Sequence, residues 1–582
     1  MINKHALKQH GFTELAAQFS DFIQRLDKTD NEHLALAAAL LSEAESQGHV
    51  CLNLATISEH HRALLSTMPV SKELWIQALK QSHVVGNVGE VKPLILTEEG
   101  VLYLYRYHHD ECFIADAIRQ RCQPLDLINA DVMTAAFSQW HTQHEGVNWQ
   151  KAAVFMALTR QFCVISGGPG TGKTTIVLRL LQMLLAQETT LKIALAAPTG
   201  KAAARLQLAV SEHNNSGLSA KTLHRLLGIT AENEQGRYHA KRPLVIDVVI
   251  VDEASMIDMN LMAILLRALP SHARLILLGD SHQLASVEAG AVLASLCEHG
   301  DSFSTSFKDN LKQITSEQIE SITNNNTPNS SLTDSIVTLK HNYRFNHEST
   351  INRLAIAVQS GELGNVYDVL RDEVLSLWVQ NIESTTIQNH VIKGYADYFD
   401  AIKAKAPPLE CLQLFEQYRV LCALKTGSHS VVSVNNMIEK RLQAYGIKTH
   451  QTFYHGRPIM IGRNDYQQRL FNGDIGLILY DKQGVLRACF KENNQLRWVN
   501  LTRLPAHETV FAMTIHKSQG SEFDIVSILL PEEENPLLNR ELLYTAITRA
   551  KKDMTIISSA HILNTAIETQ HQRETGLSAL LG

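Results

Sequence analysis

A glycine-rich segment from Gly167 to Thr175, GGPGTGKTT, has the residue types and spacing of a phosphate-binding loop. It fits G-x-x-x-x-G-K-[ST], follows the apolar run FCVIS and precedes the apolar run IVLRLLQMLL. Glycines let backbone N–H groups turn toward phosphate oxygens, aided by the N-terminus of the next helix. We expect Lys173 to reach the β- and γ-phosphates of a nucleotide and Thr174 to bind Mg²⁺. The predicted nucleotide-binding residues here are Gly167, Gly168, Pro169, Gly170, Thr171, Gly172, Lys173, Thr174 and Thr175.

Two adjacent carboxylates, Asp252 and Glu253, follow a second apolar run, DVVIV. An Asp-Glu pair by itself is usually a solvated turn. At the end of a buried strand that comes after a phosphate loop, the pair instead predicts metal chemistry. Asp252 is then expected to bind Mg²⁺ together with Thr174, and Glu253 to polarise the attacking water.

Short apolar runs alternate with helical stretches in the part of the chain that contains these residues. Such runs, each ending in small or charged residues, are typical of buried strands in a parallel sheet covered by helices on both faces. Ligands bind at the carboxyl ends of the strands in such folds. The runs are FCVISGG, KIALAAP, DVVIVDE and RLILLGD. The pattern predicts an α/β protein.

Further segments resemble, in order along the chain, the motifs of superfamily 1 helicases. They are APTGKAAARL (197–206, motif Ia), LLGDSHQLASVEAG (277–290, motif III), LKHNYRF (339–345, motif IV), TIHKSQGSEFD (514–524, motif V) and LLYTAITRAKK (542–552, motif VI). The resemblance implies two RecA-like parallel-sheet motor domains that sandwich ATP, each supplying half of the site.

This resemblance also assigns roles near the γ-phosphate. The second lobe would contribute cations, and Arg344 and Arg549 are the candidates, although either alone could be a surface arginine. Gln283 would sense the γ-phosphate, and Gln150 in NWQKAA would read the adenine edge. Tyr343 could stack on the base or belong to the core. The predicted catalytic residues are Lys173, Asp252, Glu253, Gln283, Arg344 and Arg549.

A strand of DNA would be held across both lobes by short hydroxyls and cations, residue types that bind phosphates without reading sequence. For His224 and His516, a purely structural role is the alternative. The residues implied by the resemblance are Pro198, Thr199, Lys201, His224, Thr514, His516, Lys517 and Ser518.

Within this superfamily, the chain is most similar to the RecD family, the alpha subunits of the RecBCD complex (exodeoxyribonuclease V). GGPGTGKTT, APTGKAAARL, TLHRLLG, VDEASMID and NGDIGLIL all resemble that family, as do GHVCLNL and LYLYRYHHDE in the N-terminal part. The resemblance implies 5′→3′ translocation on single-stranded DNA at DNA ends, beside RecB-like and RecC-like subunits in a heterotrimer. Beyond the ATP site we find no spaced acidic cluster typical of a nuclease, so DNA cleavage is expected in another subunit.

Four regions are predicted. Residues 1–115 form a mainly helical docking domain, residues 116–345 the first motor domain, and residues 346–582 the second. Asn-Gly and Gln-Gly turns predict a small β-barrel insertion at about 455–508. The Ser-, Thr- and Asn-rich residues 301–335 are expected to form a long surface loop.

Composition sets outer limits on function. The formal net charge of −6 is unlike that of proteins that hold DNA mainly by bulk positive charge, but it is compatible with a motor that has a local channel, so charge alone does not decide the function. Scattered cysteines, the lack of an apolar signal segment and the absence of a long apolar run predict a cytoplasmic protein without a membrane span. A stand-alone superfamily 1 helicase and a structural subunit with a vestigial ATPase remain the alternatives.

Overall fold

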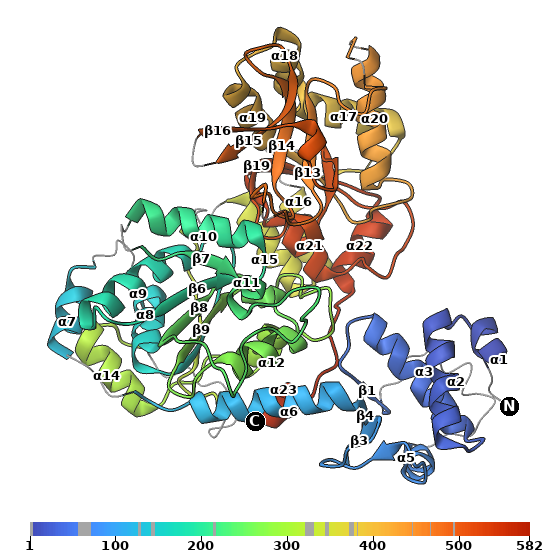
Figure 1. Cartoon of the computed structure of the whole chain (residues 1–582), viewed down its shortest axis with the longest axis vertical. Helices are drawn as coiled ribbons and strands as arrows, with labels where there is room; N and C mark the ends of the chain where they lie inside the picture. The colour runs from blue at the N-terminus through green and yellow to red at the C-terminus, as the bar shows by residue number, and fades with distance from the viewer. Residues whose placement is uncertain are drawn as a thin grey trace.

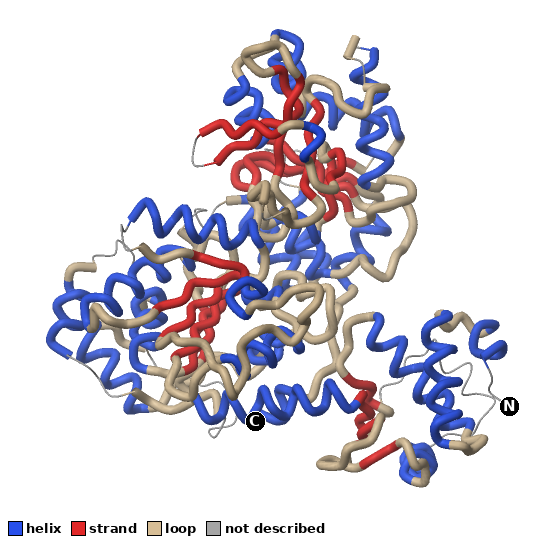
Figure 2. Tube along the Cα trace, in the orientation of Figure 1, coloured by secondary structure: helices blue, strands red, loops and turns tan. Residues whose placement is uncertain are grey.

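A computed structural model describes residues 4–55, 72–125, 130–140, 146–213, 217–319, 331–343, 349–371, 378–380, 382–444, 446–447, 449–465, 467–492 and 495–582. Figure 1 shows a small N-terminal body (blue), a central α/β lobe (cyan to green) and a second lobe (gold to red). In Figure 2 the strands of each large lobe run through its middle, with helices around them. This arrangement agrees with the predicted fold class.

The N-terminal body is mainly helical, as expected. Thr13 and Asn31 cap its second and third helices by accepting hydrogen bonds from backbone N–H groups. A small sheet of order β1-β4-β3-β2 packs against the helices. The elements are α1 (Lys4–Gln9), α2 (Glu14–Asp27), α3 (Glu32–Ser46), β1 (Cys51–Asn53), α5 (Lys72–Lys80), β2 (Val85–Gly86), β3 (Leu94–Leu96) and β4 (Val101–Leu104). The next helix, α6 (Tyr105–Arg121), leads from β4 to the first lobe, where it packs beside α12.

The first lobe is built on a parallel sheet of order β10-β5-β9-β8-β6-β7. The four apolar runs are its strands β5, β6, β8 and β9, and their side chains are almost all buried, which confirms that prediction. The strands are β5 (Phe162–Ser166), β6 (Ile193–Ala197), β7 (Ala220–Thr222), β8 (Val248–Val251), β9 (Arg274–Gly279) and β10 (Ile336–Thr338).

Helices cover this sheet on both faces (Figure 1). The predicted loop at 301–335 is wrong for residues 305–315, which form α14. Ser304 caps this helix, and Phe307, Leu311 and Ile314 bury one face against the lobe. Residues 320–330 of that segment lie outside the described residues. The helices are α7 (Ala130–Ser138), α8 (Trp149–Thr159), α9 (Lys173–Gln187), α10 (Gly200–His213), α11 (Leu223–Leu227), η1 (Ala254–Met256), α12 (Met259–Ala268), α13 (Val292–Cys297) and α14 (Thr305–Thr315).

The second lobe has its own parallel sheet, of order β11-β20-β19-β12-β18. Its strands are β11 (Trp378–Val379), β12 (Tyr418–Cys422), β18 (Ala512–Thr514), β19 (Phe523–Leu529) and β20 (Ala550–Ile557). Its helices are α15 (Thr350–Ser360), α16 (Leu363–Leu370), α17 (Ser384–Gly394), α18 (Ala396–Ala404), α19 (Pro408–Gln417), α20 (Val431–Ala444), η3 (His516–Ser518), α21 (Arg540–Ile547) and α22 (Ala560–Glu568).

An antiparallel sheet of order β16-β15-β14-β13-β17 occupies the place of the expected barrel insertion. The predicted turns are present, with Gly473 and Gly484 at positive φ between successive strands. Among the described residues, the strand pairings leave β16 and β17 at the two edges. The elements are β13 (Arg457–Ile461), β14 (Ile475–Tyr480), β15 (Leu486–Glu492), β16 (Gln495–Val499), η2 (Leu501–Arg503) and β17 (His507–Thr509).

The C-terminal segment returns from the second lobe to the first. Its last helix, α23 (Leu577–Leu581), packs beside α6 and α13 and contributes Leu577 and Leu581 to the core of the first lobe. Figure 1 shows this segment running down from α22 to the underside of the first lobe. Among the described residues, no helix is long and apolar enough to cross a lipid bilayer.

Candidate functional site

The glycine-rich segment turns sharply between β5 and α9. Gly170 and Gly172 have φ values of 83° and 86°, a left-handed conformation that glycine adopts without strain. A Cβ atom at Gly172 would lie 2.1 Å from Nε2 of Gln150, so a larger residue here would displace that amide as well as strain the backbone. The ammonium of Lys173, the first residue of α9, donates to the carbonyl oxygens of Gly167 at 2.5 Å and Gly168 at 3.1 Å. The loop therefore curls around its own lysine at the start of a helix.

Asp252 and Glu253 directly follow β8 and line the same cavity as Lys173 and Thr174, a space of about 290 Å³. Burial and the negative charge of Glu253 raise the pKa of Asp252 to about 6. Glu253 has a φ of 56°, which is strained for a residue other than glycine. Its backbone N–H donates to Oδ1 of Asp252 at 2.9 Å. The two carboxylates are thus crowded together at the carboxyl edge of the sheet.

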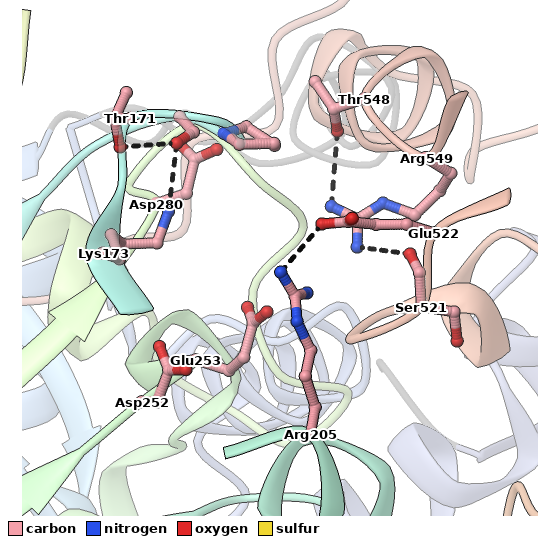
Figure 3. A network of polar contacts seen from close by, with 12 residues as sticks. Thr171, Lys173, Arg205, Asp252, Glu253, Asp280, Ser521, Glu522, Thr548 and Arg549 are labelled. Carbon is pink, nitrogen blue, oxygen red and sulfur yellow. Dashed lines mark hydrogen bonds and ion pairs between the residues drawn. The ribbon is translucent and has the colours of Figure 1, made fainter. Parts of the chain in front are cut away.

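Arg549 reaches the same cavity from the second lobe. It is 2% exposed, and burial lowers the pKa of its guanidinium. It donates to the carbonyl oxygen of Thr545 at 3.1 Å. It also donates to the carbonyl oxygen of Ser521 at 3.2 Å and to the hydroxyl of Thr548 at 3.3 Å (Figure 3). These carbonyl and hydroxyl oxygens fix the orientation of the guanidinium, and the carboxylates of Glu253, Glu522 and Asp280 place negative charge around it. Arg344 lies outside the described residues.

Gln283 belongs to a buried polar cluster at the joint between the lobes. Asp280, 1% exposed, accepts hydrogen bonds from Nε2 of Gln283 at 2.9 Å and from the hydroxyl of Tyr544 at 3.0 Å. Burial and the charge of Asp280 raise the pKa of Tyr544 well above its ordinary value, so this hydroxyl stays protonated and donates. Tyr544 lies on α21 of the second lobe and was not identified from the sequence.

Backbone contacts at Leu284 join the lobes directly. Its N–H donates to the hydroxyl of Thr545 at 2.9 Å, and its carbonyl accepts from Nε2 of Gln519 at 2.8 Å. The segment predicted to sense the γ-phosphate is therefore bonded to two segments of the second lobe. Movement at Gln283 would be transmitted to both.

Gln150 and Tyr343 flank the phosphate loop. Gln150 is buried, and its amide donates to the carbonyl of Thr171 at 2.9 Å, so it supports the loop. The backbone N–H of Tyr343 donates to the carbonyl of Gly170 at 2.8 Å. The side chain of Tyr343 is 42% exposed and lines the cavity, so it does not belong to the core. A ring in this position is available to stack on a base.

Seven of the eight predicted strand-contact residues lie on or next to two segments, one in each lobe. Thr199 immediately precedes α10 and caps it, since its hydroxyl accepts from the N–H of Ala202 at 3.2 Å. A Cβ atom at Gly520, just after η3, would lie 3.6 Å from Cβ of Ala202. We call the first turn of α10 and the η3 turn the strand-contact segments. The residues placed on or next to them are Pro198, Thr199, Lys201, Thr514, His516, Lys517 and Ser518.

These residues differ in how accessible their side chains are. Lys517 is exposed and pairs with Glu508 at 2.5 Å. Burial lowers the pKa of Lys201 to about 8, and its ammonium lies 5.7 Å from the centre of the Phe523 ring. Ser518 is fully buried and donates to the carbonyl of Ile515 at 2.6 Å, so we leave it out of the proposed strand surface.

The two predicted histidines lie in different settings. His224 is exposed to solvent at the start of α11, outside the two strand-contact segments. His516 is partly buried, and burial lowers its pKa, so its ring is neutral near pH 7. A neutral ring donates a hydrogen bond but supplies no charge to a phosphate.

An ion pair inside the cavity was not expected from the sequence. Nη2 of Arg205, on α10, lies 3.0 Å from Oε1 of Glu522, which follows η3 (Figure 3). Arg205 lies in motif Ia and Glu522 in motif V, but nothing in either motif predicts that the two side chains are close in space. The pairing depends on how the lobes meet, which a single sequence does not reveal.

Family models match three parts of the chain. Residues 8–103 match the model described as RecBCD enzyme subunit RecD, N-terminal domain. Residues 150–289 match an AAA domain, and residues 509–557 a UvrD-like helicase C-terminal domain.

Curated relatives match nearly the whole chain. The RecBCD enzyme subunit RecD of Haemophilus influenzae is 34% identical, over 94% of this chain and 93% of the relative. The ATP-dependent RecD2 DNA helicase of Deinococcus radiodurans is 29% identical, over 75% of this chain but 52% of its own length. A solved structure of Pif1 helicases on forked double-stranded DNA is 18% identical and covers 71% of this chain and 90% of its own, with a TM-score of 0.40.

Proposed function

Because this chain belongs to the RecD family of RecBCD enzyme subunits, we propose that it is the ATP-dependent DNA helicase subunit of a helicase–nuclease complex. The complex would act at double-stranded DNA ends in recombinational repair, in the cytoplasm, with RecB-like and RecC-like partners. This subunit would move 5′→3′ along one strand. One observation carries the proposal: Lys173 of the first lobe and Arg549 of the second line a single cavity.

ATP fits this cavity by the chemistry of its walls. The phosphate loop offers backbone N–H groups and Lys173 to the phosphates, and the ring of Tyr343 stands where it can stack on the base. Arg549 would supply positive charge as the terminal phosphoryl group leaves. Gln283 hydrogen-bonds to Asp280, and the next residue, Leu284, hydrogen-bonds to the second lobe. Gln283 would therefore respond to the presence or absence of the terminal phosphate.

Mg²⁺ fits beside the phosphates. Two carboxylates that repel each other strongly enough to raise the pKa of Asp252 gain free energy when a divalent cation is close. Magnesium prefers oxygen ligands and keeps several from water and phosphate. We propose the hydroxyl of Thr174 and the carboxylate of Asp252 as the protein ligands, and Glu253 as the group that orients and polarises the attacking water.

The DNA strand would lie across the strand-contact segments. Thr199, Thr514 and Lys517 offer hydroxyl and ammonium groups suited to backbone phosphates. One segment belongs to each lobe, so opening and closing of the nucleotide cavity changes the distance between them. Alternate grip by the two segments would then move the strand.

The proposal is tested with Lys173→Gln in the full chain. We expect loss of DNA-stimulated ATP hydrolysis with unchanged folding and unchanged assembly with the partner subunits, because the Lys173 ammonium hydrogen-bonds to carbonyl oxygens of its own loop. Lys192→Gln, an exposed lysine of the same lobe, is the control and should hydrolyse ATP at the wild-type rate. Full hydrolysis by Lys173→Gln would refute the motor function.

A further inference from the structure

The Arg205–Glu522 pair is a charged contact between the lobes that lies within the nucleotide cavity. Both side chains line this cavity with Lys173, Asp252 and Arg549 (Figure 3). The side chain of Arg205 is 42% exposed and that of Glu522 12% exposed. The pair is therefore accessible from the cavity, whereas Leu284 is buried.

Glu522 lies between two guanidinium groups. Arg205 contacts it directly, while Arg549 donates to the carbonyl of the preceding residue, Ser521, and experiences the negative charge of Glu522. On its other side, Arg205 faces the negative charge of Glu253 and Asp252. A guanidinium presents five N–H donors in a planar fork. Arg205 can therefore hold Glu522 with one edge and a phosphate oxygen with the other.

The two residues are also joined to the strand-contact segments. Arg205 lies four positions after Lys201 on α10, and residues at that spacing are neighbours on one helix face. Glu522 lies four positions after Ser518, the last residue of η3. A change in what Arg205 binds can therefore shift both strand-contact segments, because only a few residues of backbone separate each segment from the ion pair.

We propose that Arg205 is a positioning residue that ties occupancy of the nucleotide cavity to the separation of the strand-contact segments, with Glu522 as its anchor on the second lobe. The inference rests on the proposed function and deepens it. When a nucleotide phosphate binds Arg205, the first lobe is held to the nucleotide. The ion pair with Glu522 holds the second lobe to the same arginine, so the two strand-contact segments move closer together. A partly exposed ion pair alone contributes little to stability, so the lobes part easily once the phosphate leaves.

The test measures affinity of the full chain for oligothymidylate, with and without a non-hydrolysable ATP analogue. In the wild type we expect the analogue to change this affinity by about 5- to 150-fold, the usual range for coupled sites. In Arg205→Gln and in Glu522→Gln the factor should fall to about twofold or less, and the double variant should lose no more than either single variant. ATP hydrolysis should lose its DNA dependence mainly in kcat, with KM for ATP changed less.

Arg487→Gln is the matched control. Arg487 pairs with Asp481 at 3.0 Å, with exposed fractions of 35% and 11%, but wholly within the antiparallel sheet. In Arg487→Gln the ATP analogue should change the affinity for oligothymidylate as much as in the wild type. Arg205→Lys keeps the positive charge but loses the planar guanidinium, so the analogue should retain only part of its effect.

A wild-type factor in Arg205→Gln would overturn the inference and leave the proposed function intact, provided that DNA still stimulates hydrolysis. Additive losses in the double variant would show that the two residues act separately, which also overturns it. A wild-type chain without DNA-stimulated hydrolysis would overturn the proposed function itself.

Discussion

Asp252 holds a negative charge that its surroundings disfavour. Burial and Glu253 raise its pKa to about 6, so it becomes protonated as the pH falls through about 6. A protonated carboxyl is a poor ligand for Mg²⁺. We therefore predict that affinity of the full chain for Mg²⁺-ATP is constant above this pH and weakens below it, as measured by titration across the range.

The Glu253→Gln variant tests why the pKa of Asp252 is raised. Removing the neighbouring charge should move the midpoint of that pH dependence to lower pH, because Coulombic repulsion from Glu253 is one of the two causes of the shift. Asp252→Asn should bind Mg²⁺-ATP weakly at every pH. An unchanged midpoint in Glu253→Gln would show that burial alone sets the pKa.

Single residues could be predicted from the sequence where they lie within one short, continuous motif. Lys173, Thr174 and the Asp252–Glu253 pair were found because a strand and a helix flank them at fixed spacing, and all line one cavity. Tyr544 and Asp280 are 264 residues apart, and their hydrogen bond exists only because the lobes pack together. Such pairs carry no local signal.

Among the elements, α2 presents an apolar stripe to solvent. Leu15, Phe22 and Leu26 lie on one helix face and are 67%, 56% and 44% exposed, while the opposite face packs in the N-terminal body. An exposed stripe of large side chains marks an interface. We predict that Phe22→Asp weakens binding to the RecC-like partner by about tenfold or more, as expected for a buried aromatic anchor.

This change is measured by co-purification and by titration of the partner subunit. Val485→Asp, which replaces an exposed valine at a β-turn of the second lobe, should bind normally. Equal binding by Phe22→Asp and the wild type would exclude α2 from the interface. A mainly helical N-terminal domain was predicted from the sequence, but the sequence could not tell that this face of α2 is exposed.

Helix α14 shows how composition can mislead. Serine, threonine and asparagine dominate residues 301–335 and led to a predicted loop. Phe307, Leu311 and Ile314 nevertheless recur at helical spacing and pack on the first lobe. The periodicity was present, and the polar composition outweighed it.

On the scale of the whole molecule, the C-terminal segment ties the second lobe to the other two bodies. Arg573 donates to the carbonyl oxygens of Glu288 at 2.7 Å and Gly290 at 2.9 Å. The next residue, Glu574, accepts hydrogen bonds from the N–H groups of Val50 at 2.9 Å and Asn53 at 3.1 Å. The segment that continues from the second lobe therefore hydrogen-bonds to both the first lobe and the N-terminal body.

We predict that Arg573→Ala lowers the free energy of unfolding by about 2–3 kcal/mol, because hydrogen bonds from a charged donor are lost and its acceptors are left unpaired. Thermal unfolding of the full chain measures the effect. Arg25→Ala, which removes an exposed ion pair on α2, should cost less than about 1 kcal/mol. Equal effects would mean that the segment contributes no more than an ordinary surface contact.

The central claim is that ATP is gripped between two lobes, with Lys173 on one side and Arg549 on the other. The most direct measurement compares ATP affinity with DNA-stimulated turnover in Arg549→Ala.

We predict near-normal ATP binding and a fall in turnover of at least about two orders of magnitude, since a cation of this kind acts mainly on the transition state. Arg549→Ala that turns over ATP at the wild-type rate, with normal binding, would contradict the account.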